Sequence, residues 1–179
     1  NNNVNITTNA TLLVRDLERL KQSRVNSLSI SLDGFEANHD RLRGVDGTYQ
    51  VVMDAIEVLQ RETEIWLNIY FVVTNQNVRD LSKVYDLTVE RGIGFDFWPV
   101  NDAEDQYLVS DADQATWRKA VQHIAAVRRA AREAQRNATS RCAVRRRTSG
   151  VNHGGWCGAG RGPRARTLGA SSTRWRSAR

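Results

Sequence analysis

Residues 28–44 of the 179-residue chain read LSISLDGFEANHDRLRG. The stretch begins with the apolar, β-branched character of a buried strand, which we expect to cover Ser27–Leu32. Two turn-forming residues, an aspartate and a glycine, then interrupt it. Because alternate side chains of a strand point to the same face, Ser29, Ser31 and Asp33 should share one face. The stretch therefore places hydroxyl and carboxylate groups together at the carboxyl end of a strand.

A polar run follows this strand end and contains a histidine, an aspartate and two arginines. We expect Arg43 on a loop before the next helix, where its guanidinium could pair bidentately with a carboxylate. His39 is expected to be a loop or helix-surface residue. A hydroxyl, a carboxylate and an arginine around one strand end suit a small zwitterionic or ribose-bearing ligand. The alternative interpretation is an ordinary turn with an arginine at the surface.

The rest of the chain indicates an α/β fold in which strands alternate with helices. Apolar stripes predict helices around residues 13–20, 51–59 and 81–85, and a Ser-x-x-Asp capping pattern starts a fourth helix at Ser110. Asn77 is available as the N-cap of the third helix. The expected strands are Val4–Thr8, Ser27–Leu32, Ile65–Val73 and Gly94–Val100. Long crossovers between strands favour a parallel sheet with the strands in sequential order.

In parallel sheets the ligand site lies beyond the carboxyl ends of the strands. These ends carry polar or turn-forming residues in all four expected strands, from Thr7–Asn9 to the Trp-Pro-Val-Asn of residues 98–101. Each could be turn chemistry alone. Four together favour a shared polar site.

The chain divides by composition into an expected domain at residues 1–137 and a tail at residues 138–179. The tail contains ten Arg and no Lys, Asp or Glu, so the remaining residues carry a net charge of −4 within the total of +6. Its Arg, Gly and Ala content predicts disorder. A slipped reading frame and a nucleic-acid-binding arm both remain possible origins for the tail.

Both cysteines, Cys142 and Cys157, lie in the tail, so no disulfide framework is expected. This fits a reducing compartment, and we expect a cytoplasmic protein. The sequence has no run of 18 apolar residues, which argues against a membrane span.

Four segments resemble successive pieces of the radical S-adenosylmethionine (radical SAM) superfamily. They are TTNATLL at residues 7–13, SLDGFEANHDRLRGVDGTY at 31–49, NIYFVVTNQN at 68–77 and GFDFWPVN at 94–101. The resemblance covers about residues 4–135 and is closest to the branch of sulfatase-maturing, peptide-modifying and cofactor-biosynthesis enzymes. It implies a partial TIM-like barrel containing the third to sixth strands of the radical SAM core.

The resemblance implies oxidoreductase chemistry that uses S-adenosyl-L-methionine and a 4Fe-4S cluster. In the family, reductive cleavage of the cofactor gives a 5′-deoxyadenosyl radical, which abstracts a hydrogen atom from the substrate. It further implies a small-molecule or peptide substrate and an electron donor such as flavodoxin or ferredoxin. No membrane partner is implied, and a nucleic-acid partner is not favoured.

By resemblance, Ser31 corresponds to the family's fourth-strand serine, which contacts the carboxylate or ribose of the cofactor. Asp33 stands beside it in the motif, and Arg43 is a carboxylate partner. The remaining expected cofactor-binding residues are Thr8 and Asn9 at the third strand's end, Asn68 and Thr74 on the fifth strand, and Pro99 at the sixth strand's end near the adenine.

The chain departs from the family pattern because it has no CxxxCxxC loop and no glycine-glycine-acid segment. Both would lie upstream of Asn1, so we expect no metal ligands here and no activity from this chain alone. Cys142 and Cys157 are too few and too widely spaced for a cluster.

Two alternatives stay open at the level of sequence. The first is another TIM-like barrel enzyme without iron, although no strand ends in a lysine suited to a Schiff base. The second is a protein that binds nucleic acid through the Arg-rich tail.

Overall fold

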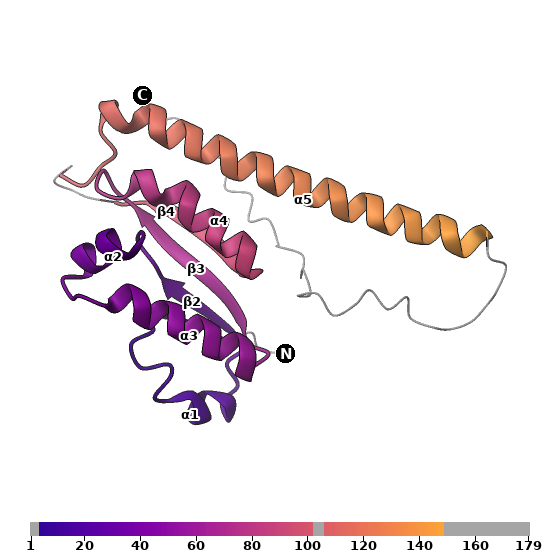
Figure 1. Ribbon diagram of the computed structural model, residues 1–179, viewed down its shortest axis with the longest axis horizontal. Coiled ribbons are helices and arrows are strands. Elements are labelled where there is room, and N and C mark those ends of the chain that lie inside the picture. The colour runs from indigo at the N-terminus through magenta and orange to yellow at the C-terminus, as the bar shows by residue number, and fades with distance from the viewer. Residues whose placement is uncertain (1–3, 102–105, 149–179) are drawn as a thin grey trace.

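A computed structural model describes residues 4–101 and 106–148 of the chain. Its centre is one sheet of four parallel strands, whose order in the sheet is β1-β2-β3-β4 (Figure 1). The strands are β1 (Asn5–Thr8), β2 (Ser27–Ser31), β3 (Trp66–Val73) and β4 (Gly94–Pro99). The predicted α/β fold with sequential parallel strands is confirmed. The sheet is open rather than closed into a barrel.

Helices follow each strand and account for most of the remaining described residues. The α-helices are α1 (Leu17–Lys21), α2 (Glu36–Arg43), α3 (Thr48–Glu62), α4 (Leu81–Arg91) and α5 (Gln114–Thr148), and the short 3₁₀-helices are η1 (Val78–Asp80) and η2 (Asp111–Asp113). Each predicted strand agrees with an observed strand to within about one residue at either end, which is the usual uncertainty of such boundaries.

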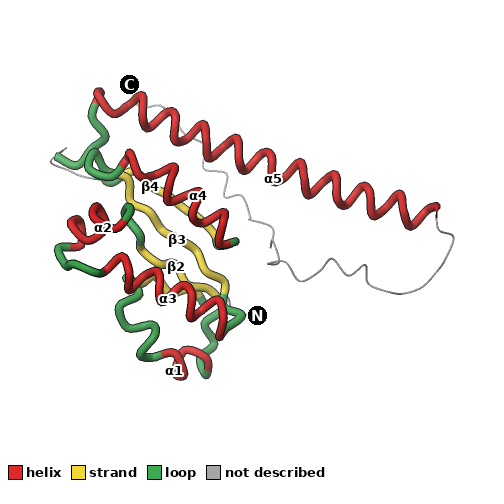
Figure 2. Tube along the Cα trace, in the orientation of Figure 1, coloured by secondary structure: helices red, strands yellow, loops and turns green. Residues whose placement is uncertain are grey.

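The hydrophobic core lies between the sheet and the helices α3 and α4, which cover the same face (Figure 2). The alternation of side chains along each strand explains why the core lies on this face. Leu28 and Ile30 of β2 and Ile69 and Phe71 of β3 are fully buried on this face, where they meet the apolar stripe of α3. Burying each such side chain contributes roughly 1.5–3 kcal/mol relative to leaving it exposed.

The opposite face of the sheet is polar and aromatic rather than aliphatic. By alternation it carries Ser27, Ser29 and Ser31 of β2. It also carries a tryptophan, an asparagine and a tyrosine of β3, and Asp96 and Trp98 of β4. Helices α3 and α4 lie on the other side of the sheet from this polar face.

Helix α2 was not predicted and changes the placement of two residues. Glu36–Arg43 is a helix, so Arg43 is its last residue and not a loop residue. His39 is its one buried residue, with 2% of its surface exposed, and not a surface residue. The prediction missed α2 because an eight-residue helix whose buried residue is a histidine has no apolar stripe.

Two predicted helix caps are wrong in detail. The Asn77 side chain does not cap the helix after it but bonds to the ends of neighbouring strands. Ser110 precedes η2, and its hydroxyl donates to the carboxylate of Asp113 (2.9 Å) instead of accepting from a backbone N–H.

Helix α5 packs against α4 and then continues beyond the expected domain boundary after residue 137 to Thr148. His123 lies on its exposed side and contacts Asp86 of α4 (2.6 Å), as expected for a helix-surface residue. The rest of the expected tail, including Cys157, lies outside the described residues. The division into two parts therefore stays a prediction.

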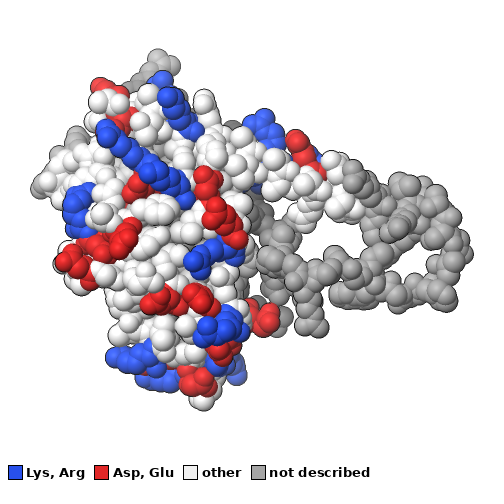
Figure 3. All heavy atoms as spheres, viewed as in Figure 1, with Lys and Arg blue, Asp and Glu red and all other residues white. Residues whose placement is uncertain are grey.

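The helix-covered face carries basic and acidic side chains interspersed with one another, with no large area of one sign among the described residues in view (Figure 3). Such a mixed surface lacks the electrostatic footprint of a nucleic-acid-binding face. Within the described ranges, no helix combines the length and the apolar character that crossing a membrane requires.

Candidate functional site at the carboxyl end of the sheet

Asp33 lies two residues after Ser31, the last residue of β2, and bonds to two other elements through its carboxylate. One carboxylate oxygen, Oδ1, accepts from the backbone N–H of Val72 in β3 (3.2 Å). The other, Oδ2, pairs with the guanidinium of Arg43 at the end of α2 (2.6 Å). The first contact extends the pairing of β2 with β3 beyond the last backbone bond, and the second ties α2 to the sheet. Two residues predicted for one site are therefore brought into direct contact.

Asn77 joins the ends of β2 and β3 from the loop before η1. Its side-chain amide Nδ2 donates to the carbonyl of Asp33 (3.0 Å) and to the carbonyl of Val72 (2.8 Å). Its Oδ1 accepts from the backbone N–H of Thr74 (2.7 Å). Only 1% of its surface is exposed. This role of Asn77 was not predicted, because its partner Asp33 lies 44 residues earlier in the chain.

His39 supports the same turn from α2. Its Nδ1 accepts from the backbone N–H of Asp33 (3.1 Å), so this nitrogen carries no proton and the imidazole is neutral. Burial lowers the pKa of His39, and the positive charge of Arg43 lowers it further. The groups that face the ring are Asp33, Asp40, Arg43 and the Tyr49 ring, and the two carboxylates oppose the lowering.

Asp40, the neighbour of His39, connects α2 to α3. Its carboxylate accepts from the backbone N–H of Tyr49 (2.7 Å), from that of Gly47 (2.6 Å) and from the hydroxyl of Thr48 (2.8 Å). These are donors at the start of α3, which has no cap from its own flanking residue. The bond from Tyr49 is the main cause that lowers the pKa of Asp40. The His-Asp pair thus fixes two different segments.

Gly34 allows the turn after Asp33 to lie close to neighbouring side chains. Its φ is +156°, and a Cβ at this position would be 2.9 Å from Asp80 Oδ2 and 3.0 Å from the Cβ of Asn38. The same Asp80 oxygen accepts from the backbone N–H of Phe35 (3.2 Å) and from the side-chain amide of Asn38 (2.9 Å). A larger residue would displace this carboxylate, so glycine is required by the contacts.

Ser31 is half-buried on the polar face, and its hydroxyl has no hydrogen bond to another residue within the described ranges. In the register of the sheet Ser31 lies beside Tyr70, and Tyr70 lies beside Asp96. A hydroxyl, a phenol and a carboxylate therefore form one row across three strands near their carboxyl ends. At the end of the sheet, Trp98 follows on the same face, with 42% of its surface exposed.

Asn68 lies one row closer to the amino ends of the strands and is buried. Its side-chain amide donates to the carboxylate of Asp96 (3.1 Å). Gly94 makes room for it, because a Cβ on Gly94 would be 2.5 Å from Asn68 Oδ1. Asn68 thus supports the row that contains Ser31 and is not at the strand end itself.

The other four predicted site residues lie in turns or at the strand ends. Thr8 accepts from the N–H of Ala10 (3.1 Å) and Asn9 from the N–H of Thr11 (3.3 Å), which are side-chain-to-backbone turn contacts. Thr74 accepts from the N–H of Gln76 in the same way (3.2 Å). Pro99 is exposed at the end of β4. Thr8 pairs with Ile30 and so lies on the core side of the sheet.

No cluster of three or more His, Cys, Asp or Glu side chains that could hold a metal ion is found among residues 4–101 and 106–148. The two cysteines of the chain could not supply the three thiolates of a 4Fe-4S cluster by themselves. The residues present therefore fit an organic ligand on the polar face better than they fit a metal.

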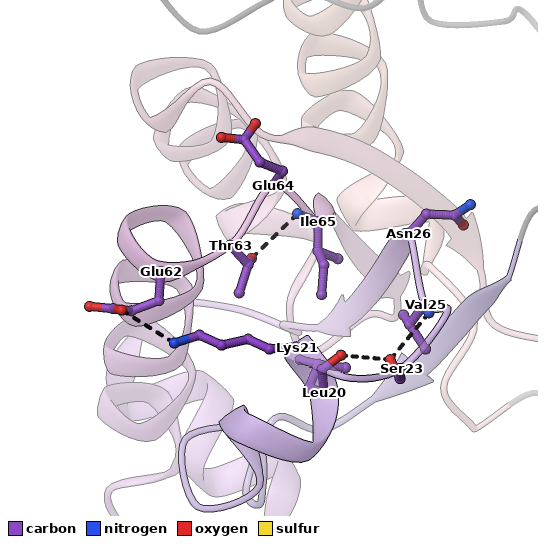
Figure 4. Close-up of a pocket in the computed structure, with 9 residues that line it drawn as sticks. All are labelled: Leu20, Lys21, Ser23, Val25, Asn26, Glu62, Thr63, Glu64 and Ile65. Atoms are coloured by element: carbon purple, nitrogen blue, oxygen red, sulfur yellow. Dashed lines mark hydrogen bonds and ion pairs between the residues drawn. The ribbon is translucent and has the colours of Figure 1, made fainter.

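A cavity of about 400 Å³ lies at the opposite, amino-terminal edge of the sheet, between the segments before β2 and β3 (Figure 4). Several of its polar lining groups make hydrogen bonds within the lining. Lys21 reaches Glu62 (3.4 Å), Thr63 accepts from the N–H of Ile65 (3.3 Å), and Ser23 donates to the carbonyl of Leu20 (2.6 Å). Ligands of parallel sheets bind at the carboxyl ends, so we do not assign the cavity to the site.

Comparison with known proteins shows which family the first half of the chain resembles. Residues 1–88 match the model of the radical SAM superfamily. The match runs from β1 into α4 and includes the Asp33 turn, α2 and β3. The resemblance to the radical SAM superfamily is thus confirmed over residues 1–88, just under half of the chain.

Two curated proteins of Methanosarcina barkeri (strain Fusaro / DSM 804) are similar to the chain over 89 residues. One is described as Fe-coproporphyrin III synthase, is 33% identical, and is matched over 49% of this chain and 22% of its own length. The other is described as AdoMet-dependent heme synthase, is 35% identical, and is matched over 49% of this chain and 25% of its own length. The aligned part thus spans a quarter or less of these relatives.

Proposed function

We propose that this chain is part of a radical SAM enzyme and that it binds the adenosylmethionine cofactor on the polar face, at the carboxyl ends of β2 and β3. The observation that carries the proposal is the half-buried Ser31 hydroxyl. It has no partner among the described residues and lies in a row with Tyr70 and Asp96. The match of residues 1–88 to the radical SAM model supports the choice of cofactor.

The chemistry of the polar face suits an adenosyl ligand with an amino-acid end. Ser31 offers one donor and two acceptor sites, and Asp96 offers acceptors for ribose hydroxyls. Trp98 provides an exposed aromatic surface on which a purine can stack. When bound together with a reduced 4Fe-4S cluster, S-adenosylmethionine supplies the radical chemistry of the family.

The iron–sulfur cluster, the reductant and the substrate lie beyond what these residues provide. We propose that the ligands of the cluster come from a part of the protein outside this sequence, because its two cysteines are too few. A redox protein such as flavodoxin or ferredoxin would supply electrons in the cytoplasm. The substrate would be a peptide or a small molecule, and the names of the two relatives favour a porphyrin-like molecule.

The non-iron barrel enzyme is a weaker candidate. All three lysines of the chain, Lys21, Lys83 and Lys119, lie on helices and not at the end of a strand. A Schiff-base mechanism therefore has no lysine at the carboxyl edge of the sheet.

The test is the affinity of the chain for S-adenosylmethionine, measured by calorimetry for the wild type and two serine variants. Ser31→Ala should weaken binding about tenfold, the scale of one lost hydrogen bond to a charged group. Ser27→Ala is the matched control, because Ser27 is on the same face of β2 but at its amino end, where it bonds to Asn5 (3.0 Å). Equal effects of the two changes would contradict the proposed site.

A further inference from the structure

All four hydrogen-bonding groups of Asp33 already have partners within the chain. Its N–H donates to His39, its carbonyl accepts from Asn77, and its carboxylate oxygens bond to Val72 and Arg43. These partners come from α2, from the loop before η1 and from β3. We call Asp33, His39, Arg43 and Asn77 the Asp33 hub. A hub of this kind fixes the backbone where β2 leaves the sheet.

The ion pair of the hub closes a short loop of the chain. Asp33 precedes α2 and Arg43 is its last residue, and the Asp33 Oδ2 and Arg43 Nη2 atoms are 2.6 Å apart. The exposed fraction of the side chain is 14% for Asp33 and 33% for Arg43. The Asp33 carboxylate already neutralises the charge of Arg43 inside the chain, which weakens the attraction of this guanidinium for the carboxylate of a ligand. Breaking the pair would leave a partly buried charge without its partner.

From this geometry we infer that Asp33 is a positioning residue and not a ligand contact, and that Arg43 serves as its partner. The hub holds the chain just after β2 and so sets the direction of Ser31, which is the last residue of β2 and lies two residues before Asp33. The statement about Ser31 rests on the proposed function, whereas the hub itself does not. The expectation that Asp33 and Arg43 bind the cofactor is replaced by an indirect role.

A double-mutant cycle on the 179-residue chain tests the hub without any ligand. Asp33→Asn keeps an oxygen for the Val72 N–H but removes the charge, and Arg43→Gln removes the matching charge. Urea unfolding should show each single change raising the unfolding equilibrium constant about tenfold, and the double change raising it no further. If the effects of the two single changes on the unfolding equilibrium constant are strictly additive in the double variant, Asp33 and Arg43 are not coupled and the inferred hub is overturned.

An exposed ion pair provides the matched control for this cycle. Lys21 and Glu62 contact each other at the surface (3.4 Å), and a cycle with Lys21→Gln and Glu62→Gln should show coupling of less than about twofold. The amide resonance of Ser31 is a second readout. It should move to the same position in Asp33→Asn, in Arg43→Gln and in the double variant, because all three break one pair. A Ser31 amide resonance that does not move in these variants would contradict the inference that the hub positions Ser31.

Titration with S-adenosylhomocysteine separates positioning from direct contact. If Asp33 acts through Arg43, Asp33→Asn should weaken binding in the wild-type background but not in the Arg43→Gln background. The same loss in both backgrounds would show direct contact and overturn the inference. If the wild-type chain does not bind this probe, the proposed function is contradicted, and the unfolding cycle alone decides whether the hub exists.

Discussion

Removing the Asn77 side chain should be among the most damaging single changes outside the aliphatic core. Asn77→Ala eliminates three hydrogen bonds and leaves the carbonyls of Asp33 and Val72 and the N–H of Thr74 without this partner. At about 1 kcal/mol for each bond, the free energy of unfolding should fall by about 3 kcal/mol. A domain of this size has a total of only about 5–15 kcal/mol, so a large part of the stability depends on one amide.

Urea denaturation followed by circular dichroism measures this loss. With a slope of about 1–3 kcal/mol per molar urea, the midpoint should fall by roughly 1–3 M. Gln76→Ala is the matched control, because Gln76 is in the same loop but exposed, and its side chain accepts a bond from Arg41 at the surface (2.7 Å). If Asn77→Ala shifts the midpoint no more than Gln76→Ala does, the conclusion that the Asn77 side chain joins the ends of β2 and β3 is refuted.

Three further outcomes are expected. The free energy of unfolding should decrease as the pH falls below about 6.5, because burial lowers the pKa of folded His39 and only the unfolded chain then takes up a proton. Urea midpoints measured across this pH range should show the decrease in the wild type but not in His39→Asn. The same pH dependence in both proteins would contradict the role of His39. Gly94→Ala should destabilise the chain by about 1–3 kcal/mol through its clash with Asn68, and Asn68→Ala should relieve much of that loss, whereas additive losses would argue against the clash. Anaerobic reconstitution of the chain with iron and sulfide should give no 4Fe-4S cluster and no 5′-deoxyadenosine, because two cysteines cannot supply three thiolates. Iron counting measures the cluster and chromatography measures 5′-deoxyadenosine, and stoichiometric amounts of either would refute the expectation.

The strands and the two helices that pack on the sheet were predictable from sequence, since each carries a strong local signal. Ile69 and Phe71 belong to an apolar run of strand length, and Val52, Ile56 and Leu59 recur at helical spacing. The order of the strands then followed from the long crossovers. These features need no knowledge of distant contacts, so the sequence alone carries them.

The candidate site was predicted less completely, because its contacts join residues far apart in the chain. Asn is a residue type common at helix N-caps, so the sequence predicts a cap at Asn77. Only the fold brings Asn77 beside Asp33, which lies 44 residues earlier in the chain. Helix α2 depends on polar tertiary contacts made by His39 and Arg43 rather than on an apolar stripe. Helix α5 continues past residue 137 because Ala and Arg have high helix propensity, although the Arg and Ala content of the tail had been interpreted as a sign of disorder.

The most direct test of the account is a titration of the ¹⁵N-labelled chain with S-adenosylmethionine, with the site located by amide chemical shifts. The account predicts shifts at Ser31 and Tyr70, at the carboxyl end of the sheet, and their loss in Ser31→Ala. Shifts confined to the amino-terminal cavity around Lys21 and Thr63, or no shifts at all, would contradict cofactor binding at this edge of the sheet.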